Sequence, residues 1–220
     1  MSQQAEKALL SKLNKLSLKD SKTPAKKNGY KNRPICTDAL SAEVTNRIAL
    51  DCEMVGIGAD GKEHMLARVS IVNERCEVVI DRYVKPQETV TDYRTEISGI
   101  RPEHIAHGVE FQEMREVVRQ IIHGKILVGH GLYNDLSVLN LRHPKYNIRD
   151  TARYRPIAKK AGSFGTPSLR SITYALLGEE IQDGSHDSVE DARAAMKIYL
   201  QFQKDWEKST LPAWVYETST

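Results

Sequence analysis

The chain has 220 residues and a mass of 24.8 kDa, which suits one domain with a complete hydrophobic core and leaves little room for a second. A composition of 40% hydrophobic and 28% charged residues, with a mean hydropathy of −0.48, fits neither a membrane-inserted nor a wholly disordered chain. No apolar run approaches the roughly 20 residues that cross a bilayer, so we expect no membrane association. Three cysteines without C-x-x-C spacing argue against a disulfide framework or a zinc site: Cys36, Cys52 and Cys76.

The net charge of +3 is unevenly distributed. Residues 1–40 contain nine Lys or Arg and three acids, a net charge of +6, so the rest of the chain is mildly acidic. A lysine-rich arm of this kind binds polyanions or an import receptor, although a solubilising tail is the plainer interpretation. Because residues 20–40 mix Pro, Gly, Asn and Lys without periodicity, we predict a flexible arm and linker over 1–41, a folded domain over 42–208 and a tail over 209–220.

The predicted elements begin with three strands in close succession, at 47–55, 65–73 and 77–84, separated by short turns. After an irregular stretch, helical periodicity appears at 111–122, followed by a short strand at 126–128 and a helix at 132–141. A last short strand at 147–149 precedes helices at 168–177 and 188–206. A meander followed by alternating helix and strand predicts an α/β fold, with a mixed sheet covered by helices on both faces.

Two acids lie in the most apolar of these strands. Alternation along a strand places Asp51 and Glu53 on the same face. Two carboxylates so close together in an apolar setting have raised pKa values unless a cation binds, which indicates a divalent metal. A solvent-facing strand edge is the plainer alternative.

Two further segments carry acids where strands meet helices. Asp135 follows the strand at 126–128 near the start of a helix, and Asp191 lies about one turn into the long last helix. His186 precedes that helix in a Gly-Ser-containing loop, where it can accept a proton from water. Helix capping and helix-dipole roles are the alternatives for both acids. Four oxygen ligands without clustered Cys or His favour Mg²⁺ or Mn²⁺, the ions of phosphoryl transfer.

These segments resemble the DEDDh exonuclease family of the RNase H-like superfamily, through D-C-E-M at 51–54, G-H-x-x-x-N-D at 129–135 and H-D-S-V-E-D-A at 186–192. The similarity extends over residues 47–206 and is closest to the RNA exonuclease 4 branch. The resemblance implies an RNase H-like exonuclease fold with a five-stranded mixed sheet and two divalent ions. It also implies 3′ to 5′ hydrolysis of nucleic acid to nucleoside 5′-monophosphates.

The resemblance further implies a role for each site residue. Asp51, Glu53 and Asp191 would hold the ion that activates water, and Asp51 and Asp135 would hold the second ion. His186 would be the general base. All five catalytic positions are filled, which favours an active enzyme.

Three other residues carry weaker expectations. Met54 could pack against the terminal sugar or base, although a core methionine fits as well. Arg94 lies where a guanidinium could meet a phosphate or a 2′-hydroxyl, with a salt bridge to Asp92 or Glu96 as the alternative. For Asp150 we expect a structural cap.

On this basis the first hypothesis is an exoribonuclease of ribosomal-RNA processing. It would act as a monomer on single-stranded RNA 3′ ends and pre-ribosomal particles in the nucleus, in particular the nucleolus. The alternatives are a DNA or mixed RNA/DNA exonuclease, and a non-catalytic RNA-binding ribosome assembly factor with a vestigial site.

Overall fold

The computed structural model describes residues 40–210, and the predictions for the basic arm and the C-terminal tail fall outside that range. Three long strands form the antiparallel meander expected from the sequence: β1 (Arg47–Ile57), β2 (Glu63–Asn73) and β3 (Val78–Lys85). The tight β1–β2 turn depends on a glycine, because a Cβ at Gly56 would collide with the backbone of Gly61. The meander therefore fixes which residues of β1 and β2 face each other.

The other half of the sheet is parallel to β1. β6 (Ile126–Gly129) pairs with the first residues of β1, and β7 (Ile148–Asp150) pairs with β6. Two very short strands, β4 (Val90–Asp92) and β5 (Val109–Glu110), pair with β1 and β3. Within the described residues the mixed sheet therefore has seven strands. The expected number of five was wrong because β4 and β5 are too short to leave a hydrophobic pattern in the sequence.

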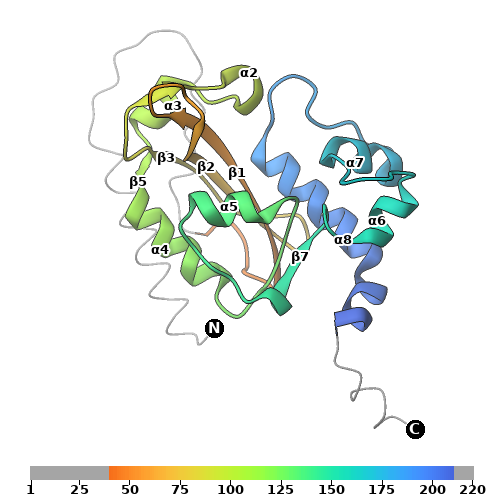
Figure 1. Cartoon of the computed structure of the whole chain (residues 1–220). Helices are drawn as coiled ribbons and strands as arrows, with labels where there is room; N and C mark the ends of the chain where they lie inside the picture. Colours follow the sequence, from red (N-terminus) through yellow and green to blue (C-terminus); the bar gives the residue numbers. More distant parts are fainter. Residues whose placement is uncertain (1–39, 211–220) are drawn as a thin grey trace, which may run out of the picture.

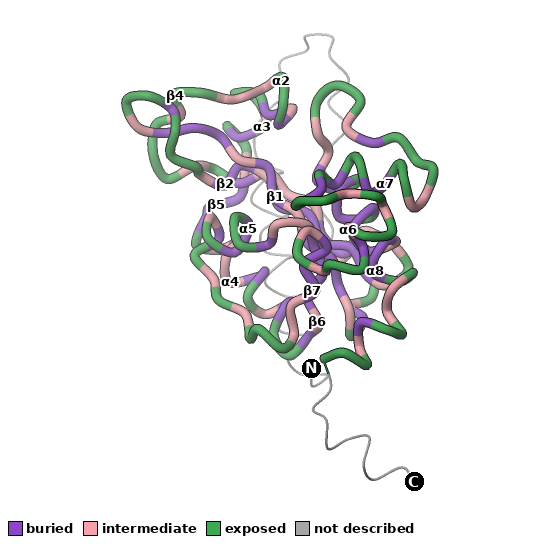
Figure 2. The backbone as a smooth tube through the Cα atoms, turned by 45° about the vertical axis from the view of Figure 1, so that its right-hand side comes forward, coloured by how far each residue is buried: buried purple, intermediate pink, exposed green. Residues whose placement is uncertain are grey.

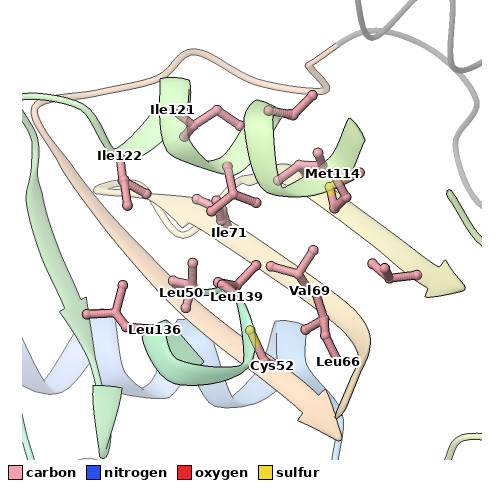
Figure 3. Packing of buried hydrophobic residues seen from close by; sticks show 14 of the residues in the cluster. Leu50, Cys52, Leu66, Val69, Ile71, Met114, Ile121, Ile122, Leu136 and Leu139 are labelled. Atoms are coloured by element: carbon pink, nitrogen blue, oxygen red, sulfur yellow. The ribbon is translucent and has the colours of Figure 1, made fainter. Parts of the chain in front are cut away.

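Helices cover both faces of the sheet, as predicted (Figure 1). On one face, α4 (Phe111–Ile122) and α5 (Leu132–Val138) enclose an apolar core with Ile48 and Leu50 of β1 (Figure 3). On the other, α6 (Arg155–Lys160), α7 (Leu169–Leu177) and α8 (Ser188–Thr210) pack with Ala49 of β1. Figure 2 shows that the buried residues gather in the strands and on the inner sides of these helices. The side chains on the two faces of β1 thus pack against two different layers of helices.

The structure also contains short elements within the stretches expected to be irregular. α2 (Thr95–Ser98) and α3 (Pro102–Ala106) follow β4, η1 (Lys145–Asn147) precedes β7, and α6 lies between β7 and α7. The helix predicted over 132–141 ends earlier, at Val138, because Asn140 takes a left-handed conformation with φ of 49°. Within residues 40–210 no helix is long and apolar enough to span a membrane.

Candidate metal-dependent active site

Asp51 and Glu53 lie in the middle of β1, on the face toward α8. Ala49, two residues earlier, packs in the core on that face, and strand alternation carries the two acids along it. Their cross-strand partners on β2 are Ser70 and Arg68. The strand therefore presents two carboxylates beside polar rather than apolar neighbours.

α8 brings the third acid to this face because it packs across β1 and β2. The Asp187 side chain caps the helix, accepting hydrogen bonds from the backbone N–H groups of Val189 (2.9 Å) and Glu190 (3.0 Å). Asp191 follows in the first turn and is buried. The cap thus fixes where the helix begins and so where this carboxylate points.

Asp51, Glu53 and Asp191 come together as one cluster. Each offers a carboxylate oxygen within 4.8 Å of the other two. Glu53 Oε1 and Asp191 Oδ1 are buried and have no hydrogen-bond partner among the described residues. Because buried oxygens without donors are costly, a hard divalent cation is the group that fits this set.

Asp135 approaches the cluster from α5. β6 pairs with β1 only over Arg47–Ala49, so the following part of β1 has an open edge on that side. The Cys52 backbone N–H donates a hydrogen bond there to Asp135 Oδ1, at 2.9 Å. A side chain at Gly129 would come within 2.9 Å of the Leu50 carbonyl oxygen, so glycine allows the β6–α5 connection to lie against β1.

The electrostatics of the four acids agree with a cation site. Burial raises the pKa of Glu53 to about 8, of Asp135 to about 7 and of Asp191 to about 6. The pKa of Asp51 also lies well above its ordinary value, because of burial first and then the charges of Asp135, Asp191 and Glu53. The four groups resist carrying four negative charges together, and divalent cations would relieve this repulsion.

His186 lies at the rim of the cluster. Its Nδ1 is 3.7 Å from Asp191 Oδ2, its backbone N–H donates to the Ile97 carbonyl, and its side chain is 37% exposed. Burial lowers the pKa of this imidazole, which favours the neutral form that accepts a proton. A group in this position can reach both the cluster and solvent.

The other three residues singled out from the sequence lie outside the cluster. Met54 is half-buried and packs against the α4–α5 core. Arg94 donates to the Gly61 carbonyl at 2.7 Å and lies 3.9 Å from Asp92, so its guanidinium braces the β1–β2 turn. Asp150 accepts a hydrogen bond from the Gly131 N–H at 2.8 Å, as a structural cap would.

Sequence reasoning missed two residues that hold the site. Arg68, opposite Glu53 on β2, forms two hydrogen bonds to Asp81 (2.8 and 2.9 Å) and one to Asp187 (3.1 Å). Gln182 Nε2 donates to Asp191 Oδ2 at 2.8 Å. Strand alternation and the short β1–β2 turn could have identified Arg68 as a neighbour of Glu53, whereas nothing local marks Gln182.

The sequence is similar to known exonucleases over most of this fold. The model of the family described as RNase_T, Exonuclease, matches residues 48–199. RNA exonuclease 4 of Mus musculus is 48% identical over 84% of this chain and 43% of its own, and that of Homo sapiens is 51% identical over 74% and 39%. The Saccharomyces cerevisiae protein of that name is 48% identical over 76% and 58%. The chain therefore spans about two-fifths to three-fifths of the length of these relatives.

Solved structures with a similar fold include the catalytic unit of Neurospora crassa Pan2. That unit has a TM-score of 0.67 and 28% identity, over 84% of this chain and 32% of its own. The Saccharomyces cerevisiae Pan2 pseudoubiquitin hydrolase–RNA exonuclease module in complex with A7 RNA has a TM-score of 0.61 and 32% identity, over 78% and 31%. The RNase H-like fold of the described residues agrees with these neighbours.

Proposed function

The chain belongs to the RNase_T exonuclease family, and we propose that it is a metal-dependent 3′ to 5′ exoribonuclease that releases nucleoside 5′-monophosphates. The observation that carries the proposal is the cluster of Asp51, Glu53 and Asp191, with two buried oxygens that lack donors within residues 40–210. A site of this kind has no evident structural purpose, because unpaired buried carboxylates destabilise a fold.

Each residue of the site has a part in the proposed reaction. Asp51, Glu53 and Asp191 would hold one divalent ion, Mg²⁺ or Mn²⁺, and Asp51 and Asp135 would hold a second. When bound, the two ions supply the charge that activates water and stabilises the leaving oxygen. His186 accepts the proton of the attacking water, since its imidazole lies beside Asp191 and is partly exposed to solvent.

RNA is the favoured substrate because the curated relatives carry the name RNA exonuclease and a structural neighbour was solved with RNA. The same proposal extends to ribosomal-RNA processing. The protein would act as a monomer on pre-ribosomal particles in the nucleus or nucleolus. A DNA or mixed exonuclease is the second candidate, since the metal chemistry does not select the sugar. A non-catalytic RNA-binding assembly factor is the third, and the intact acid cluster argues against it.

Substrate contacts by Met54 and Arg94 belong to the proposal as well. Met54 lies next to the acid pair and is half-buried, so its exposed part could contact the terminal nucleotide. Arg94 has 20% of its side chain exposed, which leaves limited surface for a ribose or phosphate. If Arg94 reads ribose, Arg94→Ala should reduce RNA cleavage more than DNA cleavage. Equal losses on both would instead match its role in bracing the turn.

The first experiment is degradation of matched 3′-labelled and 5′-labelled single-stranded RNA and DNA with Mg²⁺, Mn²⁺ or EDTA. Asp51→Asn tests the site, and Asp60→Asn, an exposed acid of the β1–β2 turn, is the matched control. We expect a metal-dependent ladder that shortens from the 3′ end, faster on RNA, for wild type and Asp60→Asn alone. Absence of wild-type cleavage with either metal would favour the assembly-factor alternative.

A further inference from the structure

Positive charge is concentrated in one segment of the fold. Residues 40–210 contain 23 Lys or Arg and 25 Asp or Glu, so this part of the chain is slightly acidic. Between residues 136 and 178, however, eight Lys or Arg accompany one acid, Asp150. This segment runs from α5 at the centre of Figure 1 through β7 to α6 and α7 at the right.

A groove of about 870 Å³ opens in this basic segment. It lies between α5, the connection to η1, β7 and the C-terminal half of α8, and three exposed cations line it: Arg142, Lys145 and Arg153. Among the described residues, Asp150 is the one acid that lines the groove. Its carboxylate is buried, accepts hydrogen bonds from the N–H groups of Gly131 and Ala152, and lies 3.7 Å from the guanidinium of Arg153, whose side chain stays 77% exposed. The groove therefore presents net positive charge to solvent.

Aromatic rings accompany the cations. The Tyr133 side chain on α5 is 73% exposed at the groove. Deeper in, Tyr154 stacks on Trp206, with ring centroids 3.9 Å apart and planes inclined by 5°. Exposed aromatic rings among cations are the combination that binds single-stranded nucleic acid, because the rings stack on bases while the cations contact phosphates.

α5 connects the groove with the acid cluster. Tyr133 and Ser137 line the groove, whereas Asp135, between them in sequence, reaches β1 at Cys52. We propose that the groove binds the single-stranded nucleic acid on the 5′ side of the nucleotide being removed. The inference rests on the proposed function for the identity of the strand, and it adds a second binding region, separate from the acid cluster.

The test is the binding of the full chain to labelled single-stranded RNA in EDTA, so that no cleavage occurs. The variant is Arg142→Ala/Lys145→Ala/Arg153→Ala, which truncates exposed side chains. For an RNA of about 20 nucleotides, the slope of log Kd against log salt concentration should be smaller for the variant than for wild type. The expected decrease is about 0.7 for each phosphate that the variant no longer neutralises, or about 2 for the three side chains together. Affinity should fall roughly tenfold or more at low salt, whereas an RNA of about four nucleotides, short enough to occupy the acid cluster alone, should bind unchanged.

The matched control removes the same charge elsewhere, with Arg75→Ala/Lys85→Ala/Arg119→Ala. These side chains are 52%, 54% and 51% exposed and lie on the β2–β3 turn, β3 and α4. Equal salt slopes for the two triple variants on the long RNA would overturn the proposal. Failure of the proposed function looks different: wild type would bind RNA but not cleave it with metal, and the binding comparison would still test the groove.

A second pair of variants tests stacking. Tyr133→Ala should weaken binding of the long RNA about fivefold or more with an unchanged salt slope, because it removes a ring that stacks on a base and removes no charge. Tyr133→Phe keeps the ring and should bind like wild type. Equal affinities of the two variants would show that the Tyr133 ring does not contribute to RNA binding by stacking.

Discussion

At the residue scale, the acids that would bind metal also destabilise the metal-free folded protein, and Glu53 shows this most clearly. Its folded-state pKa of about 8 lies above the ordinary value of 4.5, so the folded protein holds a proton that the unfolded chain has released. The stability associated with that proton is fully present below pH 4.5 and is lost as the pH rises through about 8. Metal-free protein should therefore be less stable at pH 8 than at pH 5.

We expect Glu53→Gln to remove much of that pH dependence and to stabilise the metal-free protein at pH 8. One pKa unit corresponds to about 1.4 kcal/mol, so the gain is on the order of a few kcal/mol. Metal-dependent cleavage should be lost. Urea unfolding in EDTA at pH 5 and pH 8 measures the effect, with Glu63→Gln, an exposed acid on β2, as control. An unchanged difference between the two pH values would contradict the assignment of the raised pKa to Glu53.

A bound divalent ion should offset the free-energy cost of holding these ionised acids together in the folded protein. At a concentration of about 100 times its Kd, Mg²⁺ or Mn²⁺ should stabilise the folded protein by about 2.7 kcal/mol, since it binds the assembled cluster and not the unfolded chain. Thermal unfolding with and without metal at pH 7.5 measures this as a rise in Tm. Asp191→Asn should lose the rise and Asp205→Asn, an exposed acid farther along α8, should keep it. A rise of equal size in both variants would mean that the ion binds elsewhere.

His186 should matter for rate and little for folding. Its contact with Ile97 uses the backbone N–H, which His186→Ala retains. Removing a general base costs about 10²- to 10⁴-fold in kcat, so a loss in that range is expected with an unchanged Tm. Single-turnover cleavage beside His107→Ala, an exposed histidine outside the site, measures it. A loss confined to KM would argue against proton transfer by this residue.

At the element scale, the start of α8 depends on a polar network beneath it. Arg68 joins β2 to β3 through Asp81 and to α8 through Asp187. Ser70 extends the network, since its hydroxyl donates to Asp81 at 2.8 Å and lies 2.7 Å from the Ser188 hydroxyl. The sheet and the helix that carry the acid cluster are thereby fixed to each other.

Arg68→Ala should therefore destabilise the protein by about 2–3 kcal/mol and lower kcat, because it leaves half-buried carboxylates unpaired and loosens the start of α8. Arg119→Ala is the matched control. Arg119 also makes two hydrogen bonds to one carboxylate, that of Glu116, but on the surface of α4, where a pair contributes about 0–1 kcal/mol. Urea unfolding of both variants measures the difference, and similar losses would show that the Arg68 network does not hold α8.

At the scale of the whole molecule, we expect both the basic arm and the groove to contribute to the affinity for RNA. Leu40 packs against the core and the Ser41 N–H donates to the Val79 carbonyl at 3.1 Å, so a truncation of residues 1–39 keeps these two contacts. This truncation should weaken binding of long RNA and lower its salt slope, by about 0.7 for each phosphate that the arm neutralises. Turnover of short substrates with metal should be unchanged. An unaltered salt slope would rule out contact between the arm and phosphate.

The sequence predicted the parts of this protein that depend on local patterns. The β1–β3 meander, α4 and α8 follow from alternation and helical periodicity, and alternation along β1 alone placed Asp51 and Glu53 on one face. The basic composition of residues 136–178 is also visible in the sequence, but it was not among the predictions drawn from it. The family resemblance supplied roles for individual residues, and these roles remain predictions.

What only the tertiary structure decided depends on contacts between residues far apart in sequence. β4 and β5 are too short to leave a pattern and form because a neighbouring strand is available. Asp191 meets Glu53 because α8 crosses β1, and Asp135 reaches Cys52 because β6 ends early and leaves the edge of β1 open. Gln182 and the groove beside α5 likewise exist only once the layers have packed, since burial and charge proximity are properties of the assembled fold rather than of any single segment.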